Sequence, residues 1–259
     1  MTSEPAGSKE RNARGRFSEL LKVEGELALR EPTALVMGIG VPTVLLVVFG
    51  LIGIASPGNV PGTSYTVMEL YVPTIMVIGF IFLGMDVLPM TMVRYREIGW
   101  LRRVSVTPVP PSRLLAAQLI VNLVLALAGI LIVIFGSELI FGAALDVGFP
   151  YFVLSIVLSI VVIFSFGLLI AALVPSQSVA SGVGGGLTFL FLFLAGLWTP
   201  PAAVGGPLAT IIYYSPSGAA AQALLYSVFN SAPPYTAIVT MVVYAFIFTF
   251  VATHYFRWE

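Results

Sequence analysis

The chain has 259 residues, of which 58% are hydrophobic and only 9% are charged. Because a soluble globular domain carries about 25% charged residues, this composition argues against a soluble enzyme, a disordered chain and a nucleic-acid-binding protein. The chain has no Cys and a single His, so it can form no disulfide, and His-based metal clusters and Ser-His-Asp chemistry are disfavoured. The counts predict a membrane protein with several spans, no metal site and no catalytic residues.

Several apolar segments are long enough to cross a membrane, which requires about 20 residues per helix. Six spans are expected, at about 33–55, 69–92, 114–135, 150–174, 182–198 and 235–255. A further apolar stretch at 211–229 is either a seventh span or part of a re-entrant segment over 199–234. The re-entrant form is favoured because Pro207, Pro216 and Gly218 interrupt the stretch.

Positive charge is distributed unevenly along the chain. The twelve Lys and Arg residues lie before the first expected span, between the second and third, or after the sixth, and the loops at 56–68, 136–149 and 199–234 contain none. Because basic residues mark the cytoplasmic side of a membrane protein, we expect a multi-pass plasma-membrane protein with both termini in the cytoplasm and the re-entrant segment outside. A seventh span would leave Arg257 alone on the far side.

The segment before the first span predicts an amphipathic helix over 16–31, preceded by a disordered cytoplasmic arm over 1–15. One face of this helix carries the apolar residues, and Glu24 is the one charge on that face. Such a helix lies along the inner leaflet or packs on a partner, and both interpretations stay open. The residues of the apolar face are Phe17, Leu20, Leu21 and Leu27.

The loop at 94–113 holds the densest cluster of charges in the chain. A short helix is expected from Arg94 to about Val104, and the prolines that follow end it. The positive-inside rule accounts for the arginines, but it does not account for Ile98, Trp100 and Leu101 among them. A rigid knob that is both basic and apolar predicts a surface that docks on another protein.

This loop resembles the signature loop of ABC-2 type permeases, the membrane subunits of ABC exporters, including the daunorubicin-resistance-like drug exporters. The resemblance lies in the run Arg96-Glu97-Ile98-Gly99-Trp100-Leu101-Arg102-Arg103, followed by Val106-Thr107-Pro108. Trp100 stands where Thr is common in the family, and Gln118 stands where Lys is frequent. A second, less specific similarity covers Leu194 to Pro200 and Tyr214-Ser215-Pro216, and the two together extend the likeness over nearly the whole chain.

The resemblance implies an all-α ABC-2 exporter fold with six spans, in which the loop is a coupling helix seated in a separate ATP-binding subunit. Two copies of that ATPase would bind ATP and Mg, and a second permease copy, identical or paralogous, would complete the transporter. The sequence has no G-x-x-x-x-G-K-[ST] motif, so we expect no nucleotide cofactor and no enzymatic activity in this chain. The implied coupling residues are Arg94, Arg96, Glu97, Gly99, Trp100, Leu101, Arg102 and Arg103.

Residues inside the expected spans give further hypotheses about polar contacts, helix packing and the translocation path. An acid within a span usually faces a cavity or a partner, so Asp86 either pairs with a neighbouring helix, the favoured interpretation, or contributes to a cargo or proton site; Asn122 is expected to make a structural hydrogen bond. Gly182 and Gly186 have the spacing of close helix packing, either within the chain or, as the family suggests, at a dimer seam. The expected translocation path, whose members suit ordinary packing and lipid contact equally well, comprises Met76, Phe80, Asp86, Phe189, Phe193 and Trp198.

The expected function is therefore that of a permease that exports a hydrophobic or amphipathic compound, such as a drug, a lipid or a natural product. The main alternative is a secondary transporter or channel without an ATPase partner, against which stand the single acid, the missing base and the lack of an inverted repeat in the spans. An intramembrane protease is disfavoured because the sequence lacks the H-E-x-x-H motif. A non-catalytic membrane anchor would not need six spans.

Overall fold

The computed structural model describes residues 6–61, 64–99, 111–198 and 204–255. Within these ranges the chain forms helices and no strands, and six helices are long and apolar enough to span a membrane. The all-helical, six-span fold predicted from the sequence is thus confirmed. The six candidate spans are Pro32–Ala55, Val67–Glu97, Arg113–Phe141, Phe149–Leu173, Gln177–Ala195 and Tyr235–Tyr255.

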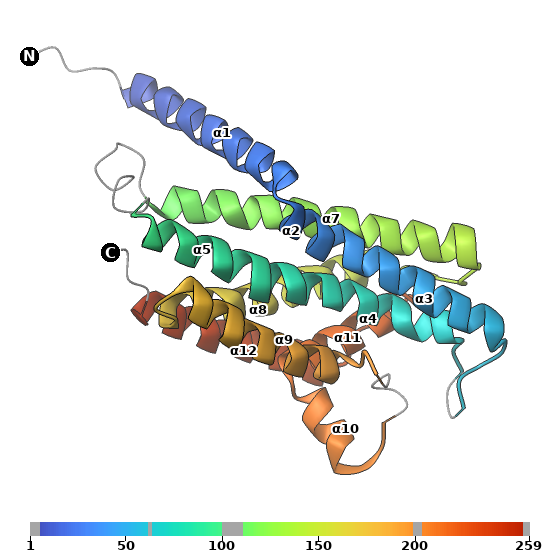
Figure 1. Ribbon diagram of the computed structural model, residues 1–259. Coiled ribbons are helices and arrows are strands. Elements are labelled where there is room, and N and C mark those ends of the chain that lie inside the picture. Colours follow the sequence, from blue (N-terminus) through green and yellow to red (C-terminus); the bar gives the residue numbers. More distant parts are fainter. Residues whose placement is uncertain (1–5, 62–63, 100–110, 199–203, 256–259) are drawn as a thin grey trace, which may run out of the picture.

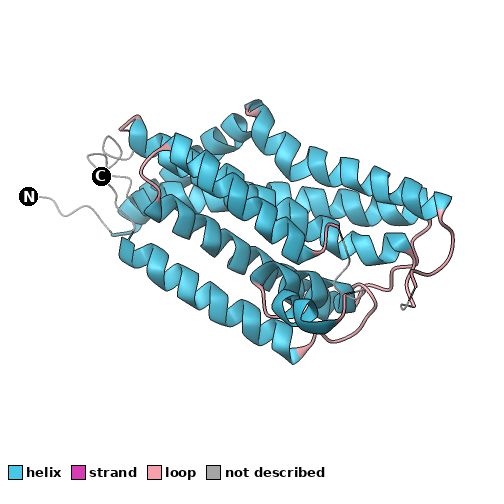
Figure 2. Cartoon of the chain, turned by 60° about the horizontal axis from the view of Figure 1, so that its bottom comes forward, coloured by secondary structure: helices cyan, strands magenta, loops and turns pink. Residues whose placement is uncertain are grey.

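The spans run side by side as a bundle, with the connecting loops gathered at its two ends (Figures 1 and 2). Helix α1 (Ala6–Arg30) precedes the first span, which consists of α2 (Pro32–Leu35), η1 (Val36–Gly40) and α3 (Val41–Ala55). The second span consists of α4 (Val67–Ile81), η2 (Phe82–Val87) and α5 (Leu88–Glu97). The remaining spans are α7 (Pro111–Phe141), α8 (Phe149–Leu173), α9 (Gln177–Ala195) and α12 (Tyr235–Tyr255), with α10 (Gly206–Tyr213) and α11 (Pro216–Ser227) between the last two.

The second span is the centre of the bundle. In its most apolar window 83% of the residues are buried, against 22% in the first span. It packs against α3, α7, α8, α9 and α11, so the side chains of residues 70–81 form a large part of the core. The capping box of Thr66 and Glu69 fixes where this helix begins, because each side chain accepts a hydrogen bond from the backbone N–H of the other residue.

Two π-helical segments interrupt the first and second spans, and each ends shortly before a proline. η1 is followed by Pro42 and η2 by Pro89. Proline lacks the N–H that would bond to the carbonyl four residues earlier, and its ring crowds that carbonyl. The carbonyls concerned belong to Gly38 and Met85, which lie inside the two widened segments. η1 and η2 contact one another, so the two wide turns face each other in the bundle.

A close backbone contact joins η2 to α8. A Cβ atom at Gly167 would overlap the carbonyl oxygen of Gly84, so only glycine allows the two helices to approach this closely. A Cβ atom at Gly84 would in turn lie 2.8 Å from a ring carbon of Phe164. This contact fixes the position of η2 against the fourth span.

The segment between the fifth and sixth spans forms two short helices. α11 is buried among α4, α8, α9 and α12, whereas most of α10 is exposed. With 12 residues, α11 is roughly 18 Å long, which is too short to cross a hydrocarbon core of about 30 Å. This arrangement agrees with the re-entrant interpretation of the segment and not with a seventh span; residues 199–203 lie outside the described ranges.

The structure corrects several expected boundaries: the second span continues to Glu97 and the third to Phe141, beyond the expected ends at 92 and 135. Residues 6–15 are helical and continue α1, contrary to the disordered arm expected over 1–15; this part of the sequence contains Ala, Lys, Glu and Arg, which favour helix. The fifth span begins at Gln177 because Ser176 caps it, and it ends where Gly196 adopts a left-handed conformation with φ 93°. The span therefore begins and ends earlier in the chain than the expected range of 182–198, because the cap at Ser176 and the left-handed Gly196 set its two ends.

Candidate functional site

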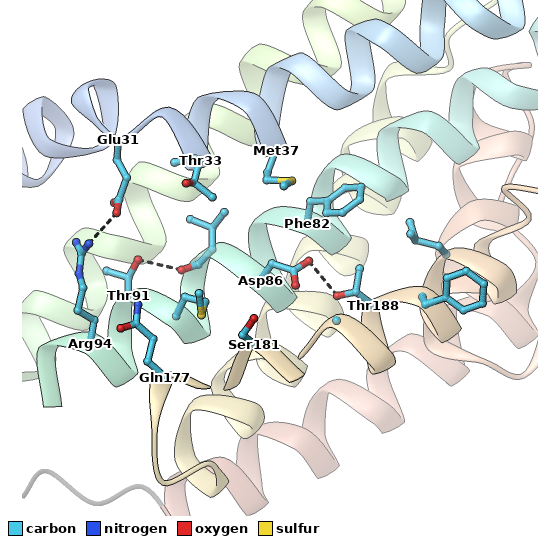
Figure 3. Close-up of a pocket in the computed structure, with 16 residues that line it drawn as sticks. Glu31, Thr33, Met37, Phe82, Asp86, Thr91, Arg94, Gln177, Ser181 and Thr188 are labelled. Carbon is cyan, nitrogen blue, oxygen red and sulfur yellow. Dashed lines mark hydrogen bonds and ion pairs between the residues drawn. The ribbon is translucent and has the colours of Figure 1, made fainter. Parts of the chain in front are cut away.

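A pocket of about 520 Å³ lies between the first span, the second span and α9 (Figure 3). Its lining is mostly apolar and includes Met37 from η1, Phe82 from η2 and Phe189 from α9. A volume of about 300–1,000 Å³ and an apolar lining with few polar groups are typical of small-molecule sites. The two π-helical segments both contribute to the walls, and such segments are frequent at functional sites.

Asp86 projects from η2 towards α9, where the hydroxyl of Thr188 donates a hydrogen bond of 3.0 Å to its Oδ2 atom (Figure 3). This contact agrees with the expected pairing of the acid with a neighbouring helix. Asp86 also lines the pocket and is only partly buried, so the same side chain faces the cavity. The two interpretations offered by the sequence are therefore compatible in the structure.

The other residues of the expected translocation path lie in three different environments: the pocket, the surface and the core. Phe189 lines the pocket beside Asp86. Phe193 and Trp198 are exposed on α9 and just after it, and the ring of Trp198 lies 4.9 Å from that of Phe189. Met76 and Phe80 are 2% and 1% exposed in the core and do not line the pocket, because the central span buries every face of its α4 portion.

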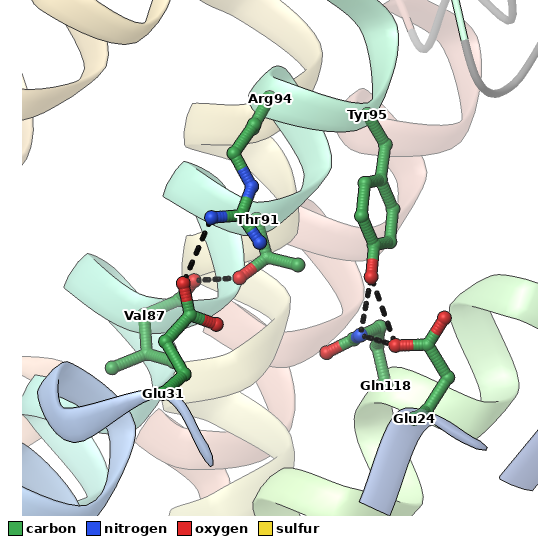
Figure 4. Close-up of polar contacts among 7 residues, drawn as sticks. All are labelled: Glu24, Glu31, Val87, Thr91, Arg94, Tyr95 and Gln118. Carbon is green, nitrogen blue, oxygen red and sulfur yellow. Dashed lines mark hydrogen bonds and ion pairs between the residues drawn. The ribbon is translucent and has the colours of Figure 1, made fainter. Parts of the chain in front are cut away.

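Two polar contacts hold α1 and the start of the first span against α5 at one end of the pocket (Figure 4). Arg94 Nη1 and Glu31 Oε1 form an ion pair of 2.9 Å. Deeper in the protein, the Tyr95 hydroxyl donates a hydrogen bond of 2.9 Å to Glu24 Oε2, and Gln118 Nε2 donates to the same oxygen. Glu24, the one charge on the apolar face of the amphipathic helix, thus makes the polar contact that joins α1 to α5 and α7.

Burial raises the pKa of the Glu24 carboxyl above its usual range. The hydrogen bonds from Tyr95 and Gln118 and the charge of Arg94 oppose part of this rise, and the nearby charge of Glu31 adds to it. The side chain is 3% exposed on a helix that is not among the candidate spans. Of the expected apolar face, Leu20 packs against the core, whereas Leu27 is 49% exposed.

Arg96 and Glu97 contact the ends of two other spans. The Arg96 guanidinium donates hydrogen bonds to the carbonyl oxygens of Ala171 and Val174, which are the last residues of α8 and its C-cap. Glu97 Oε1 accepts a hydrogen bond of 2.8 Å from the backbone N–H of Gln177, the first residue of α9. Positive charge at a helix C-terminus and negative charge at an N-terminus are both favourable, so this pair of residues joins α5 to the turn between α8 and α9.

The remaining coupling residues lie at the edge of the described ranges or beyond it. The separate helix expected from Arg94 to about Val104 is wrong: residues 94–97 are the end of α5, Ile98 is its C-cap, and Gly99 adopts φ 66°, which stops the helix. Trp100, Leu101, Arg102 and Arg103 lie outside the described residues. Gly182 and Gly186 are exposed on α9, and a Cβ atom at either position would meet nothing within 4 Å. Packing within the described part of the chain therefore does not account for the glycine spacing.

Part of the pocket lining and the hydrogen-bond partners of Glu24 were not predicted from the sequence. Nothing in the sequence marked Glu31, Met37 or Thr188, because their roles depend on how the first span and α9 face the second. Glu24 and Gln118 did carry a signal, the first as a charge on an apolar face and the second as a departure from the family pattern. Asn122 makes the expected structural hydrogen bond, from its Nδ2 atom to the carbonyl of Gln118 at 2.9 Å.

The helical bundle, the candidate spans and the pocket between them define a multi-pass membrane protein with a small-molecule-sized site. The family of ABC-2 type transporters matches residues 16–229, and the chain belongs to this family. It is thus a membrane permease of an ABC-2 type transporter, a domain that has no nucleotide-binding site of its own. Such permeases generally pair with ABC ATPase subunits. A comparison with curated proteins found no match.

Proposed function

We propose that the chain is the permease of an ATP-driven exporter, which moves a hydrophobic or amphipathic compound out of the cytoplasm through the pocket. Two copies of a separate ABC ATPase drive the transport, and each docks on the 94–104 segment of one permease copy. Both termini and this segment are cytoplasmic. The positive-inside distribution of all twelve basic residues supports this orientation.

The observation that carries the proposal is the pair of contacts made by Arg96 and Glu97. These residues end α5 inside the 94–104 docking segment, and they hold the turn between α8 and α9. The preceding turn of α5 holds α1 and the first span through Tyr95 and Arg94. A displacement of the docking segment by an ATPase would therefore reach the spans on both sides of the pocket, as in rigid-body switching between two states.

A second permease copy, identical or paralogous, packs against α9 in this proposal. The support is the exposed glycine face of Gly182 and Gly186, which no other part of the described chain contacts. Small residues let the backbones of membrane helices approach closely, and they are enriched where such helices associate. Two copies joined here would bring their pockets towards a common path.

The proposal can be tested in proteoliposomes that contain the permease and the ABC ATPase that copurifies with it. The probes are three amphipathic dyes of different charge: rhodamine 6G, Nile red and 8-anilinonaphthalene-1-sulfonate. We expect ATP-dependent transport of at least one dye. Glu97→Ala should lower the transport rate by about tenfold or more, the size of typical coupling free energies between sites, because it disconnects α9 from the docking segment.

The matched control is Glu138→Ala, which removes a half-buried acid near the other end of the bundle and should leave transport unchanged. Both variants must show the same yield and ATPase binding as the parent chain. Transport by Glu97→Ala at the parent rate would overturn the assignment of the 94–104 segment. Failure of any ABC ATPase to copurify with the chain would contradict the exporter itself.

A further inference from the structure

We propose that the pocket selects amphipathic compounds that carry one positive charge, and that the carboxylate of Asp86 binds the charged centre. The inference rests on the proposed function, because it takes the pocket as the cargo site. It adds the charge class of the cargo, which neither the fold nor the family match specifies.

The first step is the charge balance of the pocket. Of the described residues that line it, three are charged: Glu31, Asp86 and Arg94. Arg94 and Glu31 form their 2.9 Å ion pair at one end of the pocket and neutralise each other. Asp86 lies eight residues before Arg94, roughly 12 Å along the helix, and its hydrogen bond comes from the neutral Thr188. The described lining thus carries one unmatched negative charge.

The second step is the setting of the Asp86 carboxylate. Thr188 donates to Oδ2, which orients the group and leaves Oδ1 available. A Cβ atom at Gly184 would lie 3.7 Å from Oδ1, so the buried backbone of α9 comes close to the carboxylate without donating a charge to it. A carboxylate among apolar spans is costly without an opposite charge. A cationic ligand removes that cost, whereas a neutral ligand does not and an anionic one increases it.

The third step is the rest of the lining. Phe82 from η2 (Figure 3) and Phe189 from α9 both line the pocket, and aromatic faces attract cations as well as apolar groups. Met37 and Met90 add flexible, polarisable side chains that adapt to ligands of different shape. With a volume of about 520 Å³, the pocket suits a drug-sized molecule with a bulky apolar body around its charge.

The test measures equilibrium binding to the purified full chain in phosphatidylcholine nanodiscs, without ATPase or ATP. The probe is radiolabelled tetraphenylphosphonium, and the competitors are tetraphenylborate, which has nearly the same size and the opposite charge, and neutral triphenylphosphine oxide. We expect the cation to bind and both competitors to displace it poorly. Asp86→Asn should weaken cation binding by about tenfold or more, since it removes an opposite charge at close range, and should leave binding of the phosphine oxide unchanged.

Three variants make the result decisive. Asp86→Glu keeps the charge and should retain cation binding, which separates charge from folding if Asp86→Asn is poorly folded. Thr188→Val removes the hydrogen bond but keeps the charge and should retain the preference for the cation. Asp146→Asn makes the same change at an exposed acid outside the pocket and should bind like the parent chain.

Equal binding of the cation and the neutral compound, or cation binding by Asp86→Asn within twofold of the parent chain, would overturn the inference. Either result would leave the exporter proposal intact, because the transport assay includes neutral and anionic dyes. Conversely, failure of ATP-dependent transport with charge-selective binding retained would overturn the proposed function and not the charge preference of the pocket.

Discussion

Among single residues, Glu24 has the most unusual surroundings, because it is a charged side chain in the middle of the apolar face of α1. Its carboxylate accepts hydrogen bonds from Tyr95 and Gln118, two residues on two other helices. The wheel pattern of the sequence showed that Glu24 was out of place but could not supply these partners, which are 71 and 94 residues away in the chain. Gln118 gives the Glu24 carboxylate a neutral hydrogen-bond donor.

Replacing Glu24 by Ala should weaken the docking of α1 by about 1–3 kcal/mol, because it leaves two buried donors without an acceptor. Glu24→Gln keeps an acceptor and should cost less. Hydrogen–deuterium exchange of the α1 backbone amides measures both effects. Exchange in Glu24→Ala at the parent rate would show that α1 is held by its apolar contacts alone.

The docking of α1 should also depend on pH. Because burial raises the folded-state pKa of Glu24 above its unfolded value, the docked state binds the proton more tightly than the undocked state. Docking is therefore strongest below the ordinary Glu pKa and weakens as the pH rises through the raised value. The same exchange measurement, corrected for the intrinsic pH dependence of exchange, should show this slope in the parent chain and none in Glu24→Gln. If the pH dependence of exchange is equally steep in the parent chain and in Glu24→Gln, the titrating group is not Glu24.

Among the helices, prolines and glycines determine where the spans are distorted and how closely they pack, which the hydropathy pattern could not predict. Apolar length predicted the existence of each span, because a span needs little else. The π-helical segments before Pro42 and Pro89 and the contact of Gly84 with Gly167 depend on which helix faces which. These features place Asp86 against α9. The sequence could therefore name some residues of the translocation path but could not predict which of them lie together in the pocket.

The contact between η2 and α8 predicts a strong effect of one methyl group. Gly167→Ala would place its Cβ atom on the carbonyl oxygen of Gly84, which is backbone and cannot rotate away, and should destabilise the fold by about 1–3 kcal/mol. Gly40→Ala is the matched control in a span, because its Cβ atom would make ordinary contacts at 3.8 Å. Thermal unfolding in detergent compares the two; equal melting temperatures would mean that the helices separate at no cost.

The N-terminus of α9 has two caps with separable roles. Ser176 accepts a hydrogen bond from the backbone N–H of Val179, and Glu97 accepts one from that of Gln177. Ser176→Ala should cost about 1 kcal/mol of local stability and speed the exchange of the first amides of α9, but leave transport within about twofold. A loss of transport as large as that of Glu97→Ala would mean that fraying of the helix, and not its disconnection from the docking segment, stops the exporter.

For the whole molecule, the apolar stretches were enough to predict six spans, and the residues of the 94–113 loop carried the resemblance to the family, because both signals are local in sequence. The contacts of α1, α8 and α9 with the end of α5 are not local, and the sequence therefore assigned Arg96 and Glu97 to a partner alone. The structure gives both residues partners within the chain.

The proposed seam predicts that substitutions on α9 affect assembly and not folding. Gly186→Ile adds a branched side chain where a Cβ atom meets nothing within 4 Å of the same chain, so the permease should fold normally. Its self-association in nanodiscs or detergent should weaken by about tenfold, because the backbones could no longer approach. Gly25→Ile on α1, where a Cβ atom also meets nothing within 4 Å, should associate like the parent chain. If Gly186→Ile dimerises as strongly as the parent chain, the seam does not lie on this face of α9.

The contacts of Arg96 and Glu97 also restrict the directions in which the spans can move. Because they join α5 to α8 and α9 at this end, and Gly84 meets Gly167 at mid-span, we expect the second span and α8 to tilt together as one unit. The second span has 31 residues and is roughly 46 Å long, so a tilt of about 5° would carry its far end through roughly 4 Å. The displacement is therefore smallest beside Arg96 and Glu97 and largest at the far end of the span, where α4 packs against α11.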